Sequence, residues 1–199
     1  MWSFHLWGVP CRVSLLFPAL LTALMLCQPE NMAVTCLLAS VIHEGGHLLA
    51  MLLLKVPPED CVLGVFGLRI RLGSRLAGYK KYLWIALAGP LANGIAALCL
   101  WTAGCPQAAM VHGVLAALNL LPIAVLDGGE MVRCILYILL GADERASTIT
   151  QCISLLMLFS LCLCGLWLYW RQRGNPSLLI VCAYLAVTLF FSEKNEKTS

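Results

Sequence analysis

Ile42-His43-Glu44-Gly45-Gly46-His47 lies in the middle of an apolar segment that runs from about residue 32 to residue 54. The segment is long enough for one membrane-spanning helix. On a helix, residues four positions apart share a face, so His43 and His47 would present two imidazoles to one point, as a Zn²⁺ ion requires. Glu44 would lie beside them, able to act as a general base towards water that the metal activates.

A chance match is the alternative interpretation, because His-Glu-x-x-His constrains only three positions. Two observations weigh against chance. The whole chain has only four histidines, and two of them are in this pattern. Two histidines and a glutamate at the centre of an apolar helix are also costly unless they serve a site. The segment therefore predicts a metal site on a membrane helix.

Asp127 is the candidate for a third ligand, since a hydrolytic zinc site usually has three protein ligands and one open position. No charged residue occurs between Tyr82 and Leu126, and Asp127 is the acid that ends this run. Gly128 and Gly129 follow and would let the backbone turn there. The alternative is an ordinary helix stop at the membrane surface. The His-Glu-x-x-His pattern favours the ligand interpretation, because it leaves one ligand to be found.

The composition indicates an all-α polytopic membrane protein. Of 199 residues, 61% are hydrophobic and 12% are charged, and the mean hydropathy is +0.88. These values are too apolar for a soluble domain. A net charge of +3 is too small to argue for nucleic acid. Eleven cysteines are scattered through apolar runs without Cys-x-x-Cys, so we expect packed thiols and no disulfide framework.

We expect about six transmembrane helices in a single domain over residues 1–191, followed by a charged, disordered tail over 192–199. The aromatic residues of 1–10 would lie at the membrane interface. The first apolar run has a thin basic region and no small-residue cleavage site after it, so it is interpreted as a retained helix and not as a signal peptide. The expected spans cover residues 13–27, 32–54, 84–101, 107–126, 146–170 and 177–191.

Between the second and third spans the periodicity changes. Apolar and polar residues alternate from Gly67 to Gly73, which predicts a strand, and residues 61–73 could form a short β-hairpin. This loop is also the most basic, so the positive-inside rule places it in the cytoplasm. Topology alone is one explanation of these charges. Alternatively, an exposed strand edge near the metal helix would pair with an extended substrate segment.

Three segments together resemble the signatures of the site-2 protease family of intramembrane zinc metalloproteases. They occur in the family's order on successive expected spans, and the resemblance covers roughly residues 1–140. Within the family, the chain is most similar to the compact bacterial branch that includes the stage IV sporulation protease. The segments are His43-Glu44-x-x-His47, Ala88-Gly89-Pro90-x-x-Asn93 and Asn119-x-x-Pro122-x₄-Asp127-Gly128.

The resemblance implies that His43, His47 and Asp127 bind zinc and that Glu44 is the general base. Asn119 would help to hold the scissile peptide or its oxyanion. The substrate would be a transmembrane or membrane-associated protein, which must unwind locally before cleavage, and an inhibitory or regulatory membrane partner could control the enzyme. The site would face the cytoplasmic side of the cell membrane. Members of this branch usually carry a C-terminal nucleotide-sensing CBS domain, which we do not expect in this chain.

Two other functions fit parts of the sequence. A small membrane transporter or metal-binding membrane protein would also place His, Glu and Asp inside the membrane, but it has no particular need for Glu44 directly after the first histidine. The second possibility is a relative without catalytic activity, although all the positions named above are intact. Asn93 has two interpretations: it serves helix packing, or it makes a contact near the active site. His112 is expected to be an ordinary helix residue and not a ligand.

Overall fold

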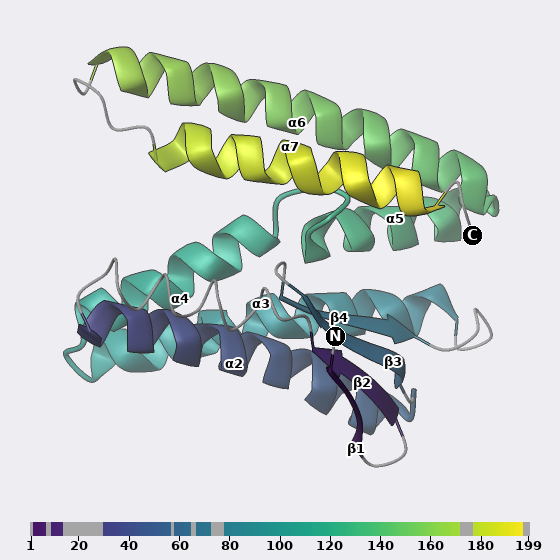
Figure 1. The fold of residues 1–199 in the computed structure, drawn as a ribbon, viewed down its shortest axis with the longest axis horizontal. Helices are drawn as coiled ribbons and strands as arrows, with labels where there is room; N and C mark the ends of the chain where they lie inside the picture. The colour runs from purple at the N-terminus through teal and green to yellow at the C-terminus, as the bar shows by residue number, and fades with distance from the viewer. Residues whose placement is uncertain are drawn as a thin grey trace. The chain divides into compact units, whose positions relative to one another are not determined.

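The computed structural model describes residues 2–6, 9–13, 30–56, 58–64, 67–72, 78–171 and 177–196 (Figure 1). The chain divides into two compact units, Met1–Leu118 and Asn119–Ser199, and each is described by itself. The expected first span over 13–27 lies outside the described residues, except for Val13, which is in a strand. All eight cysteines whose side chains are described are free thiols.

The first unit contains a four-stranded sheet in the order β1-β2-β3-β4. β1 pairs antiparallel with β2 and β3 pairs antiparallel with β4, with an irregularity between Pro58 and Asp60, while β2 and β3 are parallel. β3 and β4 lie where the alternating pattern predicts strands. The strands are β1 Trp2–Leu6, β2 Val9–Val13, β3 Pro58–Gly64 and β4 Gly67–Leu72.

The strands β1 and β2 were not expected. Aromatic and polar residues alternate in β1, and the interfacial aromatic segment expected over residues 1–10 is one interpretation of this alternation. A period of two is also the pattern of a strand. The parallel partner of β2 is β3, where Cys11 lies opposite Cys61. A partner fifty positions away leaves no local trace in the sequence, so the pattern alone could not distinguish the two interpretations.

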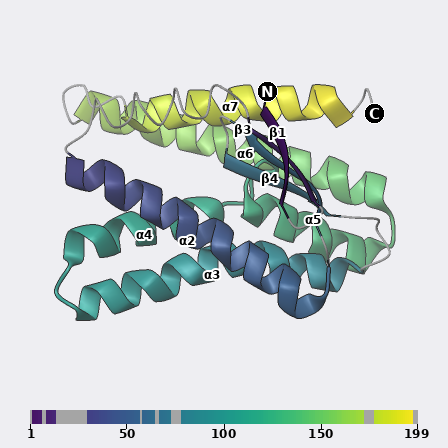
Figure 2. The same cartoon turned by 60° about the horizontal axis from the view of Figure 1, so that its bottom comes forward.

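Two long apolar helices carry most of the first unit. They are α2 (Glu30–Leu54) and α3 (Tyr79–Thr102), which lie side by side in both orientations (Figures 1 and 2). Gly46 of α2 lies against α3 so closely that an added Cβ would come within 2.6 Å of the Ala88 carbonyl oxygen and 2.9 Å of the Ala92 Cβ. Small residues allow such a close approach of two helices in an apolar environment.

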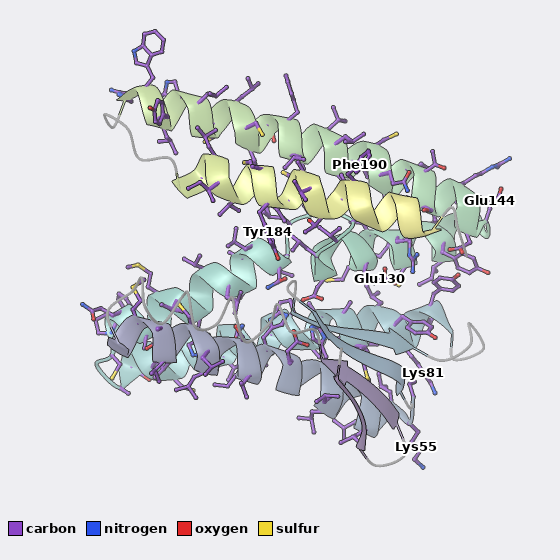
Figure 3. All side chains as sticks on the ribbon, in the orientation of Figure 1. Lys55, Lys81, Glu130, Glu144, Tyr184 and Phe190 are labelled. Atoms are coloured by element: carbon purple, nitrogen blue, oxygen red, sulfur yellow. The ribbon has the colours of Figure 1, made fainter. Side chains whose placement is uncertain are left out.

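Backbone and lysine contacts define the C-terminal end of α2. α2 stops where Lys55 takes a left-handed φ of 55°, and the Val56 amide donates to the Met51 carbonyl. Pro57 and Pro58 follow in the sequence and could not continue the helix. Lys81 donates from Nζ to the Leu54 carbonyl at 3.1 Å, which satisfies a carbonyl at the helix end. Figure 3 shows Lys55 and Lys81 at this end.

A third helix, α4 (Pro106–Asn119), follows α3 and begins on a proline, the residue favoured at the first helical position. The expected span over 107–126 is therefore too long, because α4 ends at Asn119. The segment from 120 to 126 is irregular. Pro122 has no amide hydrogen and disfavours helix at the residue before it, which explains the break.

The second unit contains α5 (Asp127–Leu140), α6 (Asp143–Arg171) and α7 (Ser177–Glu196), with α6 in contact with both of the others. Gly141, with a φ of 68°, separates α5 from α6. α7 continues to Glu196, so the helix extends into the segment expected to be a disordered tail. The core of the unit is formed by Ile123, Leu158, Cys182 and Leu185.

Three of the described helices are long and apolar enough to cross a membrane. Most residues of these three helices are exposed, and large side chains such as Leu53 (74% exposed) and Leu156 (70%) face outward. Helices that are apolar outside as well as inside are typical of membrane spans. The three are Met32–Leu54, Tyr79–Thr102 and Asp143–Arg171, and Leu178–Phe190 is a shorter apolar helix.

Candidate metal centre

The two histidines of α2 converge as the spacing predicted. His43 and His47 are 5% and 8% exposed, and their Nε2 atoms are 3.2 Å apart. The rings meet edge to face, with centroids 4.9 Å apart and planes at 82°. One turn of helix separates the two residues, so the backbone alone brings both rings to the same point.

The other nitrogen of each ring contacts α3. His47 donates from Nδ1 to the Ile85 carbonyl at 2.7 Å, and Nδ1 of His43 is 3.2 Å from Nδ2 of Asn93. Histidine ligands in metal sites almost always have such a partner on their second nitrogen, which fixes the orientation of the ring. Both Nε2 atoms are therefore directed at one point by groups of the neighbouring helix.

The histidine pair fits a zinc ion. Two nitrogens bound at 2.0–2.1 Å in a tetrahedral arrangement would be roughly 3.3 Å apart, and the two Nε2 atoms are 3.2 Å apart. Room for the rings depends on Gly89 of α3. A Cβ there would lie 2.6 Å from Cε1 of His47 and 2.9 Å from Nε2 of His43. Both the donor atoms and the space around them suit a metal.

Replacing Gly89 by alanine is expected to weaken zinc binding by about 10–100-fold, the scale on which loss of ligand orientation acts. The added methyl would meet the ends of the two imidazoles, so the rings would turn away while the helices stay packed. Gly94→Ala is the matched control, because nothing lies within 4 Å of a Cβ at that position of the same helix. Zinc affinity and thermal unfolding would be measured on both. Equal zinc affinity in the two variants would contradict the prediction.

The remaining predicted site residues are placed as follows. Glu44 follows His43 on α2 and is half-buried. Asn119 is the last residue of α4, and Asp127 is the first residue of α5, both half-buried and both in the second unit. Within one unit, therefore, the structure brings together His43 and His47.

The start of α5 is tightly defined within the second unit. A Cβ on Gly128 would collide with the carbonyl groups of Leu120 and Leu121, and one on Gly129 with that of Ile123. The irregular segment is held to α6, because the Ala124 amide donates to the Ser154 hydroxyl at 2.8 Å. The paired glycines thus allow the segment before Asp127 to fold back closely on the first turn of its helix.

Asn93 and His112 form a buried network that the sequence did not reveal. Asn93 has no exposed surface and His112 is 3% exposed. Nδ1 of His112 is 3.0 Å from Oδ1 of Asn93, whose other amide atom contacts His43. A contact near the histidine pair is therefore confirmed for Asn93, and His112, expected to be an ordinary helix residue, belongs to the same buried network. Two polar residues on successive apolar helices were the available signal.

Two comparisons with known proteins find similar ones. A model of peptidase family M50 matches residues 101–161. The site-2 protease from Methanocaldococcus jannaschii has a similar structure, with a TM-score of 0.70 and 20% sequence identity over 94% of this chain and 94% of that chain. A search of curated proteins finds no match. The two matches confirm the resemblance of the sequence to the site-2 protease family, and the structural match shows a shared fold.

Proposed function

We propose that the chain is a zinc-dependent intramembrane endopeptidase that hydrolyses peptide bonds of membrane-embedded or membrane-associated proteins. The observation that carries the proposal is the convergence of two buried imidazole nitrogens on an apolar 25-residue helix, with a glutamate directly after the first histidine. The similarity to a site-2 protease and to peptidase family M50 supports it.

His43, His47 and Asp127 would hold the metal. Two imidazoles and one carboxylate are a ligand set of hydrolytic zinc sites, which keep their fourth position open. A bound zinc ion would make water nucleophilic near neutral pH and would polarise the carbonyl of the scissile peptide. Both histidines are already oriented by α3, through Ile85 and Asn93, so little of their freedom remains to be lost on binding.

Glu44 would take the proton of the attacking water and pass it to the leaving amine, as a general base and then a general acid. Its position next to His43 on the same helix turn keeps the carboxyl near the metal without making it a ligand. Asn119 would donate from its side-chain amide to the oxyanion that develops on the carbonyl. A neutral amide suits this role because it stabilises negative charge without competing for the metal.

The outer strand of the sheet would receive the substrate. β4 is the last strand in the sheet order among the described residues, and it follows the metal helix closely in the sequence. A substrate helix has its backbone groups engaged in hydrogen bonds and must unwind before a peptide bond can be attacked. An unwound segment could pair with the β4 edge through its main chain.

We further propose a multi-pass arrangement in the cell membrane, with the loop between α2 and α3 in the cytoplasm. This loop carries the densest group of basic residues, which favours the cytoplasmic side. In a cysteine-free variant with one cysteine engineered at position 75, a membrane-impermeant thiol reagent is expected to react only in inside-out vesicles. Labelling in right-side-out vesicles would refute the arrangement.

The proposed function is tested by removing the metal. The purified protein should contain about one zinc per chain and cleave single-span substrates. A chelator should abolish cleavage, and added zinc should restore it. Cleavage that persists in zinc-free protein would refute a metalloprotease. Zinc binding without cleavage of any tested substrate would instead favour a metal-binding membrane protein or transporter.

A further inference from the structure

The hydroxyl of Ser154 ties the irregular segment 120–126 to α6. The Ala124 amide donates to Ser154 Oγ at 2.8 Å, and Ser154 Oγ donates to the Thr150 carbonyl at 2.7 Å and lies 3.5 Å from the Pro122 carbonyl. A backbone amide can only donate and a carbonyl can only accept, so the direction of these bonds is fixed. Ser154 has no exposed surface, so water is a poor substitute for its hydroxyl.

Two neighbouring hydrogen bonds of this segment are local. The Ile123 amide donates to the Leu121 carbonyl at 2.7 Å, and the Leu126 amide donates to the Ile123 carbonyl at 2.8 Å. These bonds shape the segment but do not fix it to another helix. Ile123 also belongs to the buried core with Leu158, which lies one turn after Ser154 on α6. Apolar packing has no direction, so the bond to Ser154 supplies the orientation that packing lacks.

The placement of Asp127 depends on the segment before it. The N-cap of α5 is Leu126, whose side chain has no polar atom that could cap the helix. The amides of Gly129 and Glu130 donate instead to the Leu126 carbonyl, at 3.1 and 3.2 Å. A Cβ on Gly128 would collide with carbonyl groups of the segment. The segment and the first turn of α5 are therefore in direct contact, and a shift of the segment would carry Asp127 with it.

We propose that Ser154 is a positioning residue for the third metal ligand: by holding the Ala124 amide, it sets where the Asp127 carboxylate lies. The inference rests on the proposed function, because it takes Asp127 as a ligand. α6 is long and apolar enough to cross a membrane, and irregular backbone beside such a helix needs partners within the protein. A small shift is enough to matter, since ligand atoms must lie within about 0.2 Å of their proper distances from a metal.

The first test measures zinc affinity of the full-length protein in detergent micelles, by competition with chromophoric chelators. Ser154→Ala is expected to weaken zinc binding roughly tenfold, the lower end of the range for outer partners of a ligand, because the hydroxyl acts through the backbone. Thr150→Val is the matched control. It removes a hydroxyl that is 2% exposed, lies one turn earlier on α6 and donates to the Ala146 carbonyl of the same helix, so zinc affinity should not change.

A double-mutant cycle separates positioning of the ligand from a general loosening of the fold. In the Asp127→Ala background the carboxylate is absent, so adding Ser154→Ala should weaken zinc binding no further. The weak affinities of this background would be measured with weaker chelators. If Ser154→Ala caused the same loss in both backgrounds, the hydroxyl would act on the fold and not through Asp127, and the inference would be overturned.

Ser154→Cys decides should Ser154→Ala fail to fold. A thiol is close to a hydroxyl in size but a weaker acceptor, so zinc affinity should fall between those of the parent and Ser154→Ala. Parent-like affinity in whichever of the two variants folds would overturn the inference alone. A parent protein that binds no zinc would overturn the proposed function as well. Zinc binding that is unchanged in Asp127→Ala would remove the third ligand, and the role of Ser154 with it.

Discussion

Replacing Glu44 by glutamine is expected to leave zinc bound while peptide hydrolysis falls by roughly 10²–10⁴-fold, the usual scale of a general-base contribution. Glutamine has nearly the same size as glutamate and can still form hydrogen bonds, so α2 should keep its packing. Its amide cannot take the proton of the attacking water. Zinc content and substrate cleavage would be measured on the same preparation of Glu44→Gln.

Each outcome of this experiment assigns a different role. Zinc retained with cleavage lost supports a metalloprotease. Cleavage at the parent rate would remove Glu44 from the mechanism, and loss of zinc would make Glu44 a ligand and favour metal binding or transport. Glu144→Gln is a suitable control, because Glu144 is an exposed acid in the first turn of α6 and its loss should not change cleavage (Figure 3).

Removing the ligands should have the largest effect on the metal. The double variant His43→Ala/His47→Ala is expected to bind no measurable zinc. Asp127→Ala should weaken zinc by more than the roughly 100-fold that is the upper range for outer partners of a ligand. The fold should largely remain, because packing of the apolar helices and not the metal holds each unit together. Zinc content of the purified proteins and their thermal unfolding would check both statements.

Asp127→Asn is a useful companion variant, since the amide keeps the size of the side chain but gives a weaker, neutral ligand. It should bind zinc less tightly than the parent and more tightly than Asp127→Ala. Full zinc occupancy in a stable double-histidine variant would be evidence against the whole ligand assignment. Full occupancy in Asp127→Ala alone would mean that another residue supplies the third ligand.

The histidine pair could be predicted from the sequence because its geometry is local. His43 and His47 are one helical turn apart, so the backbone of a single helix brings their rings together whatever the rest of the chain does. The apolar segments around them likewise identify α2, α3 and α6 as long helices, since length and composition suffice for that.

The contacts that orient the pair could not be predicted in the same way. Asn93 meets His43 and His112 only because three helices have a particular rotation and register, which no local sequence pattern specifies. The strand β2 was missed for a similar reason, as its parallel partner follows α2. The break after Asn119 had a visible cause in Pro122, but a proline can also bend a helix without ending it.

The contact of Gly46 with α3 limits the routes by which a peptide can reach the metal. A single methyl group would not fit between Gly46 and Ala88, so the two helices leave no seam for a substrate at this level. Thermal motion of side chains cannot widen this seam, because the atoms in contact belong largely to the backbone. A peptide must therefore enter past another face of α2, and inhibitors that block entry should be sought there and not along the α2–α3 junction.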